Sequence, residues 1–473
     1  MSLGRGASTF RRFAQLFYPH LTLVQQARRL LPFGTALALL GGFALGFTGA
    51  SQHFQGGDPL RDYSIGLVVA LLILLTIPGW PVPASHRRVL AELWLVRIGV
   101  TLGFMLLYEA YYPVLDAHHY FRAGSATEQL TSLVAAGDGT ANVTALAALF
   151  NKIMPASYHA TKVWFALLGL LGVYAFYRAA TLYLGHDDPR LLYVLGLFPG
   201  ILFWGSILGK DPVVLLGTGI FVLGVVAYAL RPRPGYLVLG AIGLIVVGLM
   251  RVWLIAILVP PLGVFLLRRN GGAGQWLIFG ALVVTVAILA VQLFIERFGV
   301  GSLSDLVRTT NEISGNFATG GSRTEVTPLA GPVDLLIQAP MSAFTALFRP
   351  LPGEVLNAFG LLAGLESALM LYLFIKGWLR RGWRRVRSSP ILLWIVITLG
   401  LWGAIYGFVS AGNLGTAVRY RLQVMPLLVL LALYVSQPVA PGRGDTTPVK
   451  PRTRRRTATL KERLDSEPMA RRP

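Results

Sequence analysis

Cysteine is absent from this chain of 473 residues, and charged side chains make up only 13% of it. Without cysteine there can be no disulfide, no thiolate nucleophile and no cysteine metal site. Soluble domains carry about 25% charged residues. This scarcity of charge, with a mean hydropathy of +0.62, predicts a polytopic membrane protein.

Acidic residues are especially few, 21 against 42 lysines and arginines, which gives a formal charge of +21. The basic residues occur in short clusters between apolar runs, a pattern that orients membrane proteins and contacts anionic lipid headgroups. No basic groove motif or aromatic stacking module accompanies them, so we expect no nucleic-acid partner.

A spanning helix needs about 20 mostly apolar residues. On that rule we predict an all-α polytopic membrane protein with about twelve transmembrane helices. They lie near residues 31–50, 64–80, 92–111, 163–183, 191–207, 212–230, 235–250, 253–268, 275–296, 356–377, 390–410 and 421–437.

The parts outside these spans are of three kinds. Residues 1–30 are predicted to be a cytoplasmic amphipathic segment, and residues 438–473 a disordered basic cytoplasmic tail, flanking a membrane domain over 31–437. With both termini cytoplasmic, the positive-inside rule places loops 112–162 and 297–355 outside, carrying short interfacial helices. We expect a bacterial inner-membrane protein.

Charge interrupts the apolar stretch "FPGILFWGSILGKDP" at Lys210 and Asp211, and we expect Asp211 to cap the helix that follows. Cations at several predicted outer helix ends suit a phosphate or pyrophosphate group. Arg419 and Arg421 are two residues apart on a helix, so only one should face a shared cavity, and we favour Arg419. The candidate substrate-binding residues here are Lys210, Arg251, Arg419, Arg421 and Asn413, the last in a polar turn.

The first outer loop supplies the candidate catalytic carboxylate, Asp116, followed by His118 and His119. It could act as a general base or hold a divalent cation such as Mg²⁺ or Mn²⁺. Adjacent histidines diverge on a helix and no third ligand is evident, so we predict no protein metal site. Glu109 and Asp211 are the second choices of carboxylate, and ordinary solvated loop polarity is the alternative.

Several charged residues fall within predicted spans, and Glu366 and Arg97 are two of them. Glu366 lies near the middle of the tenth span, where it should pair with an arginine such as Arg251 or form a hydrogen bond within the bundle. Arg97 should reach toward the inner interface.

With an aspartate in the first large outer loop, the aromatic "FPGILFWGSILGKD" and basic outer helix ends, residues 90–435 resemble polytopic glycosyltransferases of the GT-C class. The resemblance implies a polyprenyl-phosphate-linked sugar as donor and inverting transfer at the extracytoplasmic face, in surface-polysaccharide or glycoconjugate assembly. It makes Asp116 the base, and Lys210, Arg251 and Arg419 the residues for the donor phosphate. Asp116 follows the third predicted span, where the class has an acidic pair after the first.

Three other readings remain open. A polysaccharide polymerase or O-antigen ligase would share the span number and the late outer loop, although residues 297–355 contain no histidine. A lipid-linked saccharide transporter would need polar groups across the membrane depth. A non-catalytic component of a polysaccharide-export complex could carry the same binding residues.

Overall fold

The computed structural model describes residues 21–52, 57–112, 115–126, 138–267 and 273–436. These ranges are helical and contain no β-strand; their one isolated bridge joins Arg323 to Asn413. The all-α prediction is therefore confirmed. Residues 1–20 and the whole predicted tail, 438–473, lie outside the described residues, whereas residues 21–30 form the start of α2 (Leu21–Gln52).

Within the described ranges, seven helical segments are long and apolar enough to cross a membrane, which supports the prediction of a membrane protein. Each matches a predicted span. Three of them are single helices: α8 (Tyr158–Leu184), α11 (Lys210–Leu230) and α20 (Pro390–Val409). The segment Leu30–Gln52 is the later part of α2, Pro59–Gly79 is α3 (Pro59–Thr76) with a 3-10 turn, and Ala358–Arg380 begins with α18 (Ala358–Gly377). The segment Ala84–Tyr111 consists of α4 (Ala84–Gly99), a π-helical turn and α5 (Met105–Tyr111).

Of the other five predicted spans, one is the continuous 26-residue helix α15 (Ala273–Phe298), and four are shorter, broken or bent helices. Proline lacks an N–H and interrupts helical hydrogen bonding, as at Pro199 and at Pro260–Pro261. The segments are α9 (Pro189–Leu197) with α10 (Pro199–Trp204); α12 (Pro234–Met250); α13 (Val252–Leu258) with α14 (Gly263–Leu267); α15 (Ala273–Phe298); and α21 (Leu414–Arg421) with α22 (Met425–Val435), which are bent by 76°. The twelve-span count stays a prediction.

Helix starts follow simple local chemistry. Several helices begin at a proline, whose missing N–H is not needed in the first turn. Asp58, Asp188 and Ser389 precede such prolines, and each side chain accepts a hydrogen bond from a backbone N–H two or three residues on. These caps fix where α3, α9 and α20 enter the bundle.

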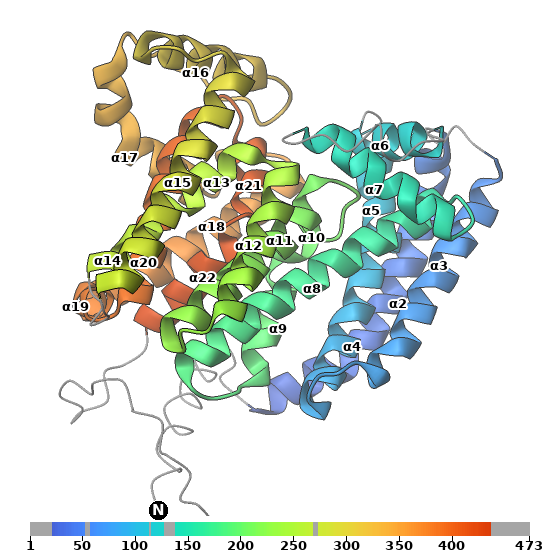
Figure 1. Ribbon diagram of the computed structural model, residues 1–473. Helices are drawn as coiled ribbons and strands as arrows, with labels where there is room; N and C mark the ends of the chain where they lie inside the picture. The colour runs from blue at the N-terminus through green and yellow to red at the C-terminus, as the bar shows by residue number, and fades with distance from the viewer. Residues whose placement is uncertain (1–20, 53–56, 113–114, 127–137, 268–272, 437–473) are drawn as a thin grey trace, which may run out of the picture.

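Helix α11 packs between α8 and α12 (Figure 1). Glycine permits the closest approach: a Cβ on Gly243 of α12 would lie only 2.6 Å from the carbonyl oxygen of Gly217 in α11. Such small-residue contacts let helix backbones approach where no hydrophobic force drives them together.

Short helices lie across one end of this bundle (Figure 1). Helices α6 (Asp116–Ser125) and α7 (Gly139–Ile153) occupy the described part of 112–162. Helices α16 (Leu303–Phe317) and α17 (Pro332–Phe348) occupy much of 297–355, while α19 (Trp383–Ser388) lies at the opposite end. The candidate residues gather at the end covered by α6 and α7.

Candidate functional site

Asp211 lies at the centre of a buried ion-pair group. It is in the first turn of α11, only 1% of its side chain is exposed, and both carboxylate oxygens accept from arginines. Oδ1 is 3.3 Å from Nη2 of Arg251, and Oδ2 is 2.8 Å from Nε of Arg419. The capping prediction was wrong: Gly209 is the N-cap of α11, and the Asp211 carboxylate instead joins two distant helices.

Arg251 is held at the break between α12 and α13, where the backbone leaves the helical region. The residue is buried, and its guanidinium lies 4.4 Å from the ring centroid of Tyr420 in α21. Cation–π stacking and the Asp211 carboxylate together compensate its charge in an apolar setting. Arg251 therefore has little freedom to move toward a ligand.

Arg419 extends from this interior to the surface. Besides Asp211 it contacts Asp116 at the start of α6, with 3.3 Å between Nη1 and Oδ2, and its guanidinium lies 5.7 Å from the ring centroid of Trp204. The Asp116 side chain is 61% exposed. Of the two carboxylates bound to Arg419, Asp116 is therefore the one that a substrate could reach.

Lys210 completes a set of five residues that we call the charged cluster: Asp116, Lys210, Asp211, Arg251 and Arg419. The ammonium of Lys210 donates to Oγ1 of Thr140 in α7, at 2.9 Å. Three cations face two carboxylates, so the cluster carries one positive charge in excess. Such an excess favours an anionic ligand.

A cavity of about 440 Å³ adjoins the cluster, and Arg419 lines it. Its walls come from the π-helical turn Val100–Phe104, from α5, α10, α18 and α21, and from the segments before α17, α18 and α21, and most of its surface is apolar. The aromatic lining residues are Phe104, Tyr108, Tyr112, Phe203, Trp204 and Phe359, and the polar ones include Ser322, Asn357, Glu366, Asn413, Thr416 and Arg419. A mostly apolar cavity with a few polar groups is typical of a small-molecule or lipid site.

Asn413 forms part of the cavity wall and also caps α21. Its Oδ1 accepts from the backbone N–H of Thr416 and from the hydroxyl of Ser322, and its Nδ2 donates to the carbonyl of Thr319. Asn413 therefore fastens the segment before α17 to the turn that carries Arg419.

Arg421 is turned away from the cavity lining. Its guanidinium donates to the carbonyl oxygens of Ala346 and Arg349 at the end of α17 and to Ser367 of α18. These contacts tie α17 to α18. The two arginines of α21 thus have separate partners, as their spacing on a helix predicts.

The remaining site candidates lie outside the charged cluster. Glu109 is buried and accepts from Nζ of Lys162 at 2.7 Å and from the hydroxyl of Tyr158 at 2.9 Å, which joins α5 to α8. His118 is buried with its ring 5.1 Å from that of Tyr158, whereas His119 is exposed on α6. Neither histidine lines the cavity.

Glu366 and Arg97 each form a hydrogen bond with the backbone of another helical segment. Glu366 accepts from the N–H of Gly200 at 2.5 Å and faces the cavity, so the expected hydrogen bond within the bundle is present, with a donor outside its own helix. Arg97 is fully buried and donates to the carbonyl of Gly205 and the hydroxyl of Ser206. The prediction that Arg97 reaches the interface was wrong, because the end of α10 inside the bundle offers it acceptors.

Among the described residues, no three His, Asp or Glu side chains are grouped so that they could hold a metal ion. Asp116 has no second carboxylate beside it in the cluster except Asp211, whose oxygens both bind arginines. A divalent cation would therefore need ligand oxygens from a substrate as well as Asp116.

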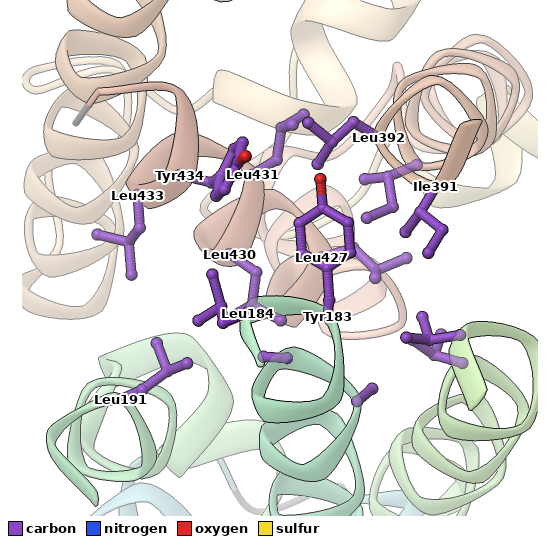
Figure 2. A pocket seen from close by; sticks show the side chains of 15 residues that line it. Tyr183, Leu184, Leu191, Ile391, Leu392, Leu427, Leu430, Leu431, Leu433 and Tyr434 are labelled. Atoms are coloured by element: carbon purple, nitrogen blue, oxygen red, sulfur yellow. The ribbon is translucent and has the colours of Figure 1, made fainter. Parts of the chain in front are cut away.

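A second, smaller cavity of about 60 Å³ is wholly different in character. Figure 2 shows leucine, isoleucine and tyrosine side chains converging on it, among them Leu184, Leu191, Leu392 and Leu431. The only side-chain oxygens in its lining are the hydroxyls of Tyr183 and Tyr434. We interpret this space as imperfect packing between α8, α9, α11, α20 and α22.

Sequence reasoning missed the aromatic lining of the large cavity. Its signal was present in "LYEAYYP", which holds Tyr108 and Tyr112, and in "FW" at 203–204. Compared with known protein families, curated proteins and solved structures, the chain matches none of them.

Proposed function

We propose that the protein is a membrane glycosyltransferase that moves a sugar from a polyprenyl-phosphate-linked donor to an acceptor hydroxyl. The proposal rests on the position of Arg419. This residue lines an aromatic cavity and also pairs with the exposed Asp116. A lipid-linked sugar needs an apolar site for its chain, a cation for its phosphate and a base for the acceptor. The three lie next to one another here.

In the proposed reaction, the residues of the charged cluster have separate roles. The acceptor oxygen attacks the anomeric carbon, the bond between that carbon and the phosphate oxygen breaks, and polyprenyl phosphate leaves. Asp116 takes the proton of the acceptor hydroxyl. Arg419 and Lys210 stabilise the charge on the departing phosphate, and Asp211 holds Arg419 and Arg251 in place.

We place this reaction at the extracytoplasmic face of a bacterial inner membrane, with about twelve spans and both termini cytoplasmic. Supporting this, the end of the bundle opposite α6 and α7 carries basic residues at the start of α4, the end of α11 and in α19, as in Figure 1. These are Arg87, Arg88, Arg231, Arg384 and Arg387. Positive residues favour the cytoplasmic side, and anionic lipids are their expected partners.

The test is mass spectrometry of lipid-linked sugars and surface glycans in a deletion strain that expresses each variant at matched membrane abundance. Asp116→Asn should abolish the glycan and cause the donor lipid or the unextended acceptor to accumulate. Glu312→Gln, an exposed carboxylate on α16, is the matched control and should restore the glycan fully. Full rescue by Asp116→Asn would remove the base and with it the proposal.

A transporter of lipid-linked saccharides is the second candidate, because several helices break inside the bundle. The chain leaves helical geometry between α10 and α11 and again at Arg251, and transporters place substrate sites at such breaks. The same deletion and variant strains distinguish transport from sugar transfer. If transport is lost, the donor stays on the inner leaflet, where an impermeant oxidant of sugars cannot reach it. Loss of transfer leaves it on the outer leaflet.

A further inference from the structure

Helices α5 and α18 face each other across one wall of the large cavity. Side chains close this wall, because the two helix backbones do not pack directly against each other. Within the described part of the chain, these two helices make almost no close backbone approach. The ring of Phe359, at the start of α18, fills the space between them. Its centroid lies 5.4 Å from that of Tyr108, 5.9 Å from Phe104 and 6.3 Å from Phe203.

Phe359 also marks the border between the cavity and the outer surface of the bundle. Leu362 lines the cavity and yet is 50% exposed, so this wall continues directly into the outward face of α18. Leu361 and Leu365 extend that exposed apolar face. In a bilayer such a face lies against lipid chains, so a chain could pass from lipid to cavity without crossing a polar surface.

The position of Phe359 allows its ring to move. It is the second residue of α18, whose cap is Asn357, and the preceding turn contains Gly353 with φ of +94°. Residues at a helix start are restrained by fewer intrahelical bonds than those in its middle. A change of rotamer at Phe359 would therefore break no hydrogen bond within α18.

We propose that the cavity is loaded sideways from the bilayer between α5 and α18, and that Phe359 is the gate. The ligand class is an amphiphile with one long apolar chain and an anionic head, the chain entering past Phe359 and the head stopping at Arg419. This inference rests on the proposed function for the identity of the head group. The route itself depends only on the cavity and its wall.

The absence of cysteine makes a direct test clean, since introduced thiols have no competitors. Phe359→Cys combined with Tyr108→Cys replaces the gate ring by a thiol on α18 that faces a second thiol on α5, so that a short bismaleimide can tie α5 to α18 across the entrance. The same double variant treated with N-ethylmaleimide gains bulk without the tie and is the control. The probe is an isoprenyl monophosphate with a diazirine at its chain end, supplied in vesicles.

The measurement is the rate of photolabelling of peptides that line the cavity. The tied protein should label at least about tenfold more slowly than the control, and Phe359→Ala should label faster than wild type. Leu361→Ala, on the exposed face beside the gate, should label at the wild-type rate. Equal labelling of tied and control protein would overturn the gate, and so would wild-type protein that takes no label in the cavity.

The glycan assay keeps this inference separate from the proposed function. Slow labelling of the tied protein together with full rescue by Asp116→Asn would leave the gate standing and remove the transferase. Loss of glycan in Asp116→Asn together with equal labelling of tied and control protein would support the transferase and overturn the gate.

Discussion

Replacing Asp211 by asparagine should destabilise the protein more than any change at an exposed carboxylate. The substitution keeps the shape of the side chain and removes the only charge between Arg251 and Arg419. Removing one partner of a buried ion pair costs about 3–5 kcal/mol, because the other charge is left uncompensated. Arg419 is partly exposed and retains Asp116, so we expect about 3 kcal/mol, arising mainly from Arg251.

Asp116→Asn is the matched control, since it removes a charge from the same cluster at an exposed position, where ion pairs contribute about 0–1 kcal/mol. In domains of 150–250 residues each 1 kcal/mol shifts the melting temperature by about 2–4 °C, and a chain twice as long should shift about half as much. We therefore expect a fall of about 3–6 °C for Asp211→Asn and about 2 °C or less for Asp116→Asn.

The assay is tryptophan fluorescence during heating in detergent, which the ten tryptophans of the chain make possible. Adding Arg251→Met to Asp211→Asn should recover part of the loss, because the stranded guanidinium is then gone. If Asp211→Asn melts within 1 °C of Asp116→Asn, the bridging carboxylate does not stabilise the cluster and the reasoning is refuted.

Three further outcomes are expected away from the cluster, measured by the same heating assay. Lys162→Met strands the buried carboxylate of Glu109 and should cost about 3–5 kcal/mol, most of which Glu109→Gln should restore in the double variant; no restoration would contradict the ion pair. Arg421→Lys keeps the charge but loses the fork that joins α17 to α18, and should cost about 1–3 kcal/mol, so an unchanged melting temperature would contradict that role. Burial tends to raise the pKa of Glu354, but hydrogen bonds from Arg349 and the backbone outweigh it and hold this pKa below 4.5. The resulting stabilisation is present above pH 4.5 and is lost as the pH falls through the folded-state pKa, so Glu354→Gln should flatten the acid side of the stability curve. An acid side as steep as that of wild type would exclude Glu354 as its source.

The sequence by itself determined the class of the protein and the approximate positions of its clearest helices. Hydropathy is a sum over neighbouring residues, so it predicted an all-α membrane protein and seven segments that the structure has as long apolar helices. It was less reliable where proline interrupts an apolar run. Residues 191–207 are apolar enough for a span, but the chain breaks between α9 and α10 at Pro199.

Helical spacing also predicted that Arg419 and Arg421 would point in different directions, because two residues of a helix differ by about 200°. Which of them would meet a cavity was a matter of the surrounding helices. The partners of Arg421 lie 54 to 75 residues earlier in the chain, and those of Arg419 up to 303 residues earlier.

Only the tertiary structure decided the charged cluster and the cavity. Asp211 looked like a local helix cap, yet its oxygens bind residues 40 and 208 positions away. The aromatic residues from α5, α10 and α18 form one wall although they are distant in the sequence. Burial and pairing depend on which helices pack together, and that is settled by the sum of many side-chain contacts along whole helices, which no local pattern contains.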